Sequence, residues 1–342
     1  MFNLDWIKKL FRDNTPKTVP DYEFRPLSFS MFATDVWAVG GGKGGVGKSL
    51  LASNLGIALS KRGKKVLLID ADLGAANLHT FLGVEGGRAA FSSFLKEEIS
   101  DIRSLIIKTP VPNLDLISGA KDSLDVADVG VEKIARLKNS LRRVEYDNVI
   151  LDIGPGTAST LLDLFLMSNE GIIMATPEPT TIENNYRFLK CLFLRKIRLL
   201  ADSQQDGRLK EILMKIFSDK WSVRVRTVAD ILDQLYSLDP QQGRTLREYI
   251  SDTRISMVMN QTRDEAEARI GPSIKQACSD YFGVDIRLLG TVAYDSSVGD
   301  SIRTRKPLLV HYSGSPAAAS IEACARSLTD KNPQTAGMAN TY

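Results

Sequence analysis

Short apolar runs alternate with amphipathic stretches along most of the chain. Runs of strand length, rich in Val, Ile, Leu and Met, occur at residues 36–39, 66–69, 114–117, 149–151, 172–175, 255–259 and 288–292. Helical spacing of apolar positions follows most of them, at residues 49–62, 131–144, 157–168, 181–200, 265–282 and 316–328. Continuously apolar strands separated by helices are typical of a sheet that is covered on both faces. The pattern predicts an α/β fold with a mostly parallel twisted sheet and helices on both faces.

Three parts of the chain depart from this alternation. Residues 201–254 are charged and helical in pattern, so we expect a helical insertion within a domain that spans residues 35–328. Residues 1–13 have the pattern of a short amphipathic helix, and residues 14–34 contain three prolines and are expected to form an extended linker. Residues 329–342 are polar and are expected to be a disordered tail.

Composition excludes few classes of protein. The 342 residues are 43% hydrophobic and 25% charged, as in ordinary globular proteins, and the net charge of +3 does not by itself indicate nucleic acid as a partner. The cysteines Cys191, Cys278 and Cys324 form no CxxC pair, so we expect buried free thiols in a reducing cytoplasm. No apolar run reaches the roughly 18 residues of a membrane span, and the N-terminus lacks a signal peptide's apolar core. We expect a cytoplasmic protein that is at most peripheral on the inner face of the cell membrane.

A glycine-rich turn follows the first predicted strand. Residues 42–49 read Gly-Lys-Gly-Gly-Val-Gly-Lys-Ser and fit the P-loop pattern G-x-x-x-x-G-K-[ST] between a strand and a helix. Such glycines let backbone N–H groups converge on phosphate oxygens, and the helix N-terminus adds favourable partial charge. We expect Lys48 to reach the β- and γ-phosphates of a nucleotide and Ser49 to ligate Mg²⁺. The predicted nucleotide-binding residues of this turn are Gly42, Lys43, Gly44, Gly45, Val46, Gly47, Lys48, Ser49 and Leu50.

Three acidic side chains follow apolar strands further along the chain. Asp70 and Asp72 end the run at 66–69, and side chains two residues apart can point the same way from the carboxyl end of a strand. Asp152 ends the run at 149–151 like a Walker B acid, which holds Mg²⁺, usually through water. A single acid at a strand end can merely cap a helix. Three acids in this order behind a P-loop favour a nucleotide site, in which residues 153–156 would act as a switch that senses the γ-phosphate.

A second lysine in the P-loop, Lys43, makes residues 43–49 similar to the deviant Walker A loop of the MinD/ParA superfamily of ATPases. Residues 70–83 begin Asp-Ala-Asp-Leu-Gly-Ala-Ala-Asn-Leu and resemble the FlhG and MinD branch more than plasmid-partition ParA. Residues 176–184 and 290–307 resemble FlhG-like proteins. The resemblance covers residues 35–200 and 254–328.

The resemblance implies a slow ATPase that binds ATP and Mg²⁺ as a face-to-face homodimer. Lys43 would reach across the dimer to the partner's nucleotide, and the position that matches Asp72 orients the attacking water. The position that matches Asp70 supports the metal site, and Asn260 matches an asparagine that reads adenine. The predicted catalytic residues are therefore Lys43, Lys48 and Asp72, and the predicted metal residues are Ser49, Asp70 and Asp152.

Two features leave the partner of such an ATPase open. On a helical wheel, one face of the segment Met1–Asp13 carries Phe2, Leu4, Trp6, Ile7, Leu10 and Phe11, opposite Asp5, Lys8, Lys9 and Arg12. This pattern fits a helix that lies on a membrane surface, or one that docks on the protein or on a partner. Basic clusters occur at Arg195, Lys196 and Arg198, at Arg224 and Arg226, and at Arg303, Arg305 and Lys306. They could bind DNA non-specifically, although the near-neutral total charge favours a solvated surface.

The leading hypothesis is an ATP-driven spatial regulator resembling FlhG and MinD, which places flagella, division sites or other cargo. We expect a protein partner that stimulates its hydrolysis. The alternative is a ParA-like partition or cargo-positioning ATPase that binds DNA non-specifically. A related Mrp-type iron–sulfur carrier is disfavoured by the missing CxxC, and a pseudo-ATPase by the complete set of predicted catalytic residues.

Overall fold

The computed structural model describes residues 34–87, 89–119, 129–204, 207–217 and 227–330. The predicted N-terminal helix (1–13), nearly all of the predicted linker and most of the predicted tail lie outside these residues, as do Arg224 and Arg226. The predicted domain boundaries stay a prediction.

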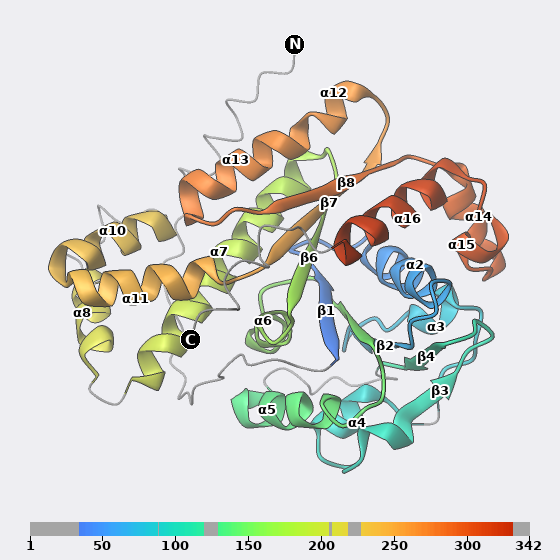
Figure 1. The fold of residues 1–342 in the computed structure, drawn as a ribbon, viewed down its shortest axis with the longest axis horizontal. Helices are drawn as coiled ribbons and strands as arrows, with labels where there is room; N and C mark the ends of the chain where they lie inside the picture. Colours follow the sequence, from blue (N-terminus) through green and yellow to red (C-terminus); the bar gives the residue numbers. More distant parts are fainter. Residues whose placement is uncertain (1–33, 88, 120–128, 205–206, 218–226, 331–342) are drawn as a thin grey trace.

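Eight strands of the described chain form one sheet in the order β3-β4-β2-β5-β1-β6-β7-β8 (Figure 1). The strands are β1 (Asp35–Gly40), β2 (Val66–Ala71), β3 (Ile106–Lys108), β4 (Leu114–Ile117), β5 (Asn148–Ile153), β6 (Glu170–Ala175), β7 (Ile255–Thr262) and β8 (Arg287–Ala293). Every pairing is parallel except that of the edge strand β3 with β4. The predicted fold class is confirmed, and β3 is the strand that the sequence pattern did not predict.

Alternating side chains of the strands build two apolar layers. Val36 and Ala38 of β1 pack into one layer, whereas Trp37 and Val39 pack into the other. The first layer is covered by α4 (Phe91–Leu95), α5 (Gly130–Leu141), α6 (Ser159–Leu166), α7 (Pro179–Ser203) and α13 (Ile270–Phe282). The second is covered by α2 (Lys48–Ser60), α3 (Leu78–Phe81), α15 (Leu308–His311) and α16 (Pro316–Thr329). Burial on both faces explains why the strands are continuously apolar.

The segment between α7 and β7 forms a helical group of its own. It contains α8 (Arg208–Ile216), α10 (Val228–Leu238) and α11 (Pro240–Ser251), which pack on the second half of α7 (Figure 1). The Lys196 ammonium of α7 donates to the Thr253 hydroxyl at 2.6 Å and lies 4.4 Å from the ring centroid of Tyr249. Figure 1 shows this group at the opposite end of the molecule from α2 and α16.

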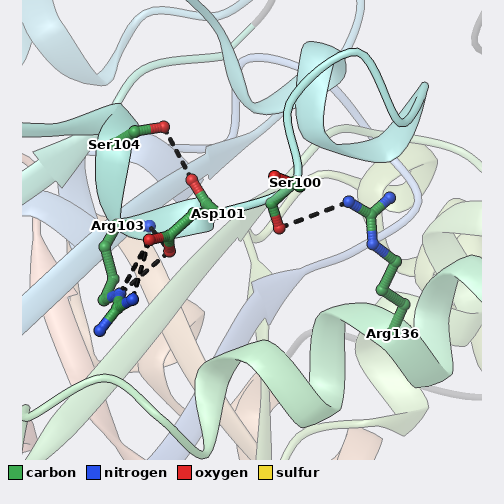
Figure 2. A network of polar contacts seen from close by, with 5 residues as sticks. All are labelled: Ser100, Asp101, Arg103, Ser104 and Arg136. Carbon is green, nitrogen blue, oxygen red and sulfur yellow. Dashed lines mark hydrogen bonds and ion pairs between the residues drawn. The ribbon is translucent and has the colours of Figure 1, made fainter.

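A polar network fixes the loop that leads into β3 (Figure 2). Asp101 caps the short 3₁₀ helix η1 (Ile102–Leu105) by accepting from the backbone N–H of Arg103 at 3.0 Å, and it also binds the guanidinium of Arg103. Arg136 of α5 donates to the carbonyl of Ile99 at 2.9 Å and covers the Phe94 ring. This loop is thereby tied to the helical layer.

The remaining helices are short or lie near the C-terminal end of the described chain. The predicted helix at 265–282 is divided at Arg269 into α12 (Glu265–Ala268) and α13, and α14 (Ser296–Thr304) precedes α15. Across the residues that the structure describes, no helix combines the length and the apolar character that a membrane span needs.

Candidate functional site

A cleft of about 960 Å³ opens at the carboxyl ends of the strands, beside the P-loop. Ligands bind at this edge in open α/β sheets. Of the predicted site residues, those that line the cleft are Gly44, Gly45, Gly47, Lys48, Ser49, Leu50, Asp72 and Asn260. Those that do not line it are Gly42, Lys43, Val46, Asp70 and Asp152, although all of them lie in the same loops or strand ends.

The P-loop leaves no room for side chains at two of its glycines. Gly47 has a φ of 101° directly before α2, and a Cβ there would lie 2.4 Å from the side-chain nitrogen of Asn260. A Cβ at Gly42 would lie 2.0 Å from the carbonyl oxygen of Asn184. The loop therefore packs directly on β7 and on the first turns of α7, and its backbone can face a ligand.

Lys48 is buried and directed toward the acidic groups of the site. Its side chain is 7% exposed, and its ammonium donates to the carbonyl of Lys43 at 2.9 Å. Burial lowers the pKa of Lys48, and the charges of Asp152 and Asp72 oppose that shift. A buried ammonium on the wall of the cleft is suited to bind phosphate oxygens.

Asp152 is the last residue but one of β5 and is buried, with 1% of its surface exposed. Among the residues that the structure describes, neither of its carboxylate oxygens has a hydrogen-bond partner. Burial, followed by repulsion from Asp70, raises the pKa of Asp152 to about 8, against the opposing effects of the Ser49 hydroxyl and Lys48. An unpaired buried carboxylate beside a hydroxyl fits the oxygen ligands of Mg²⁺.

Mg²⁺ would have to take most of its ligands from elsewhere. Among the described residues, no group of three His, Cys, Asp or Glu side chains is placed to hold a metal ion. Mg²⁺ is commonly bound by one or two protein ligands together with phosphate oxygens and water. The residues present therefore fit a metal that enters with a nucleotide.

Asp70 lies beside Asp152 but is directed to the backbone. In the register of β2 and β5, Asp70 stands opposite Asp152. Its carboxylate accepts from the N–H of Leu78 at 3.0 Å and from that of Asp72 at 3.3 Å. Burial raises the pKa of Asp70 to about 7, while the Leu78 and Asp72 N–H groups oppose the shift. Asp70 thus holds the turn that carries Asp72, and it does not reach the cleft wall.

Asp72 lies on the cleft wall next to the predicted switch. One carboxylate oxygen accepts from the N–H groups of Gly74 and Ala75 at 3.1 and 3.0 Å. A Cβ at Gly154 would lie 2.8 Å from that same oxygen. These contacts leave the second oxygen of Asp72 available to accept a hydrogen bond within the cleft.

Lys43 and Asn260 stand at opposite sides of the P-loop. The Lys43 ammonium is outside the cleft and donates to the hydroxyl of Thr180 at 2.8 Å. The Asn260 side chain is 4% exposed and donates to the carbonyl of Val46 at 2.8 Å. A β-bulge follows Asn260, with Gln261 at a φ of 60°. The bulge ends the regular strand where the cleft begins.

Asn185 is a site residue that the sequence pattern did not predict. Its side-chain oxygen accepts from the N–H of Gly42 at 3.1 Å, and its nitrogen donates to the carbonyl of Met174 at 2.8 Å. The residue clamps the start of the P-loop between β6 and α7. The available signal was a polar residue within the buried stripe of α7, which includes Ile182 and Tyr186.

Comparison with known proteins agrees with this geometry. The model of the CobQ/CobB/MinD/ParA nucleotide-binding domain matches residues 37–308. The septum site-determining protein MinD of Synechocystis sp. is 30% identical over 197 residues, 57% of this chain and 70% of that protein. The antiactivator FleN of Pseudomonas aeruginosa is 29% identical over 188 residues, 52% of this chain and 66% of that protein.

A solved structure shares the fold. MinD of Pyrococcus horikoshii, in complex with Mg-ADP, aligns with a TM-score of 0.58 at 21% identity, over 87% of this chain and 96% of that one. The family match covers most of this chain, and the MinD and FleN relatives agree with the resemblance seen in its P-loop. The protein therefore belongs to the CobQ/CobB/MinD/ParA nucleotide-binding family and is an Mg²⁺-dependent ATPase.

Proposed function

We propose that the protein is an ATP-driven spatial regulator of the MinD and FlhG kind, which acts as a dimeric switch. The observation that carries this proposal is the position of Lys43. The groups expected to bind phosphate and Mg²⁺ converge on one cleft, whereas the ammonium of Lys43 lies outside it. A loop lysine that its own cleft does not use is free to serve a second copy.

Different residues of the cleft have different roles in binding and hydrolysing ATP. The P-loop N–H groups and Lys48 bind the phosphates of ATP, and Asn260 faces the base. Ser49 and Asp152 would hold Mg²⁺, which would neutralise phosphate charge, and Asp70 keeps the neighbouring turn in place. Asp72 orients the attacking water through its available oxygen, and Lys43 of the other copy stabilises the charge that develops on the γ-phosphate.

Slow turnover follows from the incomplete site of a single copy. Without a second copy, the cleft lacks the positive charge that Lys43 would bring to the transferring phosphate. The contact between Asp72 and Gly154 lets the switch respond when that phosphate leaves. ATP would therefore join two subunits, and hydrolysis would separate them.

The helical group of residues 201–254 is proposed as the surface for a protein partner that stimulates hydrolysis. None of the described residues of α8, α10 and α11 lines the cleft, and the relative FleN is named as an antiactivator. A cytoplasmic protein that reaches the membrane through Met1–Asp13 fits this proposal. Non-specific DNA binding is less favoured, because Arg195 and Lys196 are engaged with Asp163 and Thr253 inside the protein.

The dimer is tested by sedimentation velocity with and without ATP and Mg²⁺. We expect ATP to shift the protein from monomer toward dimer, and Lys43→Ala to abolish the shift while most nucleotide binding is retained. Equal mass with and without ATP, or an unaffected Lys43→Ala dimer, would contradict the proposal.

A further inference from the structure

The ammonium of Lys43 is held by a neutral group. It donates to the Thr180 hydroxyl at 2.8 Å, and no ion pair of Lys43 within 4 Å is formed among the described residues. The carboxylates nearest to Thr180 along the chain have other partners. Glu178 accepts from the hydroxyl of Thr176, and Glu183 pairs with Arg187. Within the described part of the chain, no carboxylate therefore forms an ion pair with Lys43.

The Thr180 hydroxyl, which binds the Lys43 ammonium, also lies where a positive charge is disfavoured. Thr180 stands in the first turn of the 25-residue helix α7, directly after Pro179. The N-terminus of a helix carries partial positive charge, which attracts anions and repels cations. An exposed hydrogen bond to a hydroxyl contributes little on its own. The contact thus fixes the direction of Lys43 without holding it strongly.

The backbone brings Lys43 to this place. Gly42 lies against α7, where the Asn184 carbonyl leaves no room for a Cβ, and its N–H donates to Asn185. The next residue, Lys43, consequently emerges at the first turn of α7 and not inside the cleft. The resting direction of Lys43 is therefore set by the packing of the P-loop on α7.

We propose that Thr180 is a positioning residue that keeps Lys43 in a weakly held resting state at the rim of its own cleft. Phosphate oxygens bound to a second copy then compete successfully for the ammonium. The inference rests on the proposed function, because it assigns Lys43 to the dimer. A carboxylate at position 180 would turn the weak hold into an ion pair and would oppose the dimer.

The test measures the dimer dissociation constant by analytical ultracentrifugation in a non-hydrolysable ATP analogue with Mg²⁺. We expect Thr180→Asp to weaken the dimer by about tenfold or more, with unchanged affinity of the monomer for the analogue. Thr180→Ser retains the hydroxyl and should match the wild type, and Thr180→Val should tighten the dimer by about two- to fivefold. Thr181→Val is the matched control, because Thr181 bonds to Thr176 and not to Lys43, and it should leave the dimer unchanged.

A second readout does not need the dimer. The acylation rate of the Lys43 amine, followed by mass spectrometry in nucleotide-free protein, should fall in Thr180→Asp and not in Thr181→Val. A wild-type protein that never dimerises defeats the proposed function, while the acylation rates still decide whether Thr180 holds Lys43. A wild-type dimer with unchanged affinity and unchanged acylation in Thr180→Asp overturns the inference alone. Dimers weakened equally by Thr180→Val and Thr180→Asp also overturn it, since Thr180 would then belong to the interface itself.

Discussion

The cleft edge buries charged side chains, whereas the helical group between α7 and β7 exposes apolar ones. At the cleft, Lys48, Asp70 and Asp152 are all less than a tenth exposed, and the carboxylate of Asp152 has no hydrogen-bond partner. The helical group buries mainly apolar side chains and exposes others. Seven large apolar side chains are exposed in the described chain, and four belong to this group, Met214, Phe217, Tyr236 and Leu238.

The difference separates two kinds of function. Buried charges that lack full compensation cost stability and persist where a ligand supplies the missing partner. Exposed apolar side chains of a helical group are typical of a surface that meets another protein. The cleft therefore holds the groups proposed to act in catalysis, and the helical group offers the surface proposed for a protein partner.

Removing the lysine that would contact phosphate should have the largest effect on the cleft. Lys48→Ala removes a buried ammonium of the cleft wall that interacts with the charges of Asp152 and Asp72, and the other lysine of the loop, Lys43, does not line the cleft. We expect ATP affinity to fall by about 100-fold, or about 2.8 kcal/mol. Isothermal titration would measure the loss, and the dimer should disappear with it. Retained tight binding would remove Lys48 from the phosphate site.

Asp72→Ala separates binding from hydrolysis within the same cleft. Asp72 accepts hydrogen bonds from Gly74 and Ala75 and lies beside Gly154, and among the described residues its carboxylate makes no hydrogen bond with the P-loop. We expect normal ATP binding and dimerisation, with single turnover slowed by about tenfold or more, so that the dimer accumulates. Size-exclusion chromatography in ATP, run beside the kinetics, would show this. A wild-type rate would exclude Asp72 from the mechanism.

A buried lysine of α7, at its contact with the helical group, makes the stability of the protein depend on pH. Lys196 is 4% exposed, and burial lowers its pKa to about 8, against the opposing charge of Asp252. The unfolded chain then binds more protons than the folded one between about pH 8 and 10.5, so this group adds stability as pH rises through that window.

Lys196→Met should remove that rise. We expect the free energy of unfolding of the wild type, relative to Lys196→Met, to increase by about 1–3 kcal/mol between pH 7 and 10. Urea unfolding at both pH values would measure it. A constant difference between the two proteins would show that Lys196 has the same pKa in the folded and unfolded states.

Substitutions on the surface of the helical group should change ATP affinity and basal hydrolysis the least. Met214→Ser and Tyr236→Ser change side chains that are 63% and 45% exposed and that do not line the cleft. Basal hydrolysis and ATP affinity should change by less than about threefold, because surface substitutions rarely alter stability much. Stimulation by a protein partner should be lost. A tenfold loss of ATP affinity would contradict the separation of the two regions.

The existence of seven of the eight strands, the P-loop and the acids at strand ends could be predicted because each depends on local sequence. Continuous apolar runs identify buried parallel strands, and the loop pattern requires its glycines wherever it occurs. The strand β3 could not be predicted, since it has only three residues at a sheet edge, two of them half-buried and one exposed. The bond of Asp70 to Leu78, the bond of Asn185 to Gly42 and the contact of Lys43 with Thr180 join residues 8 to 143 positions apart in the sequence.

Mixing two impaired variants shows whether Lys43 acts in the cleft of a second copy. In a mixed dimer of Lys43→Ala with Asp72→Ala, one cleft would combine an intact Asp72 with the Lys43 of the other subunit. ATPase assays on the mixture and on each variant alone supply the comparison. We predict hydrolysis in the mixture well above that of the two separate variants. If the mixed dimers form but hydrolyse no faster than the separate variants, Lys43 does not act across the dimer and the account is wrong.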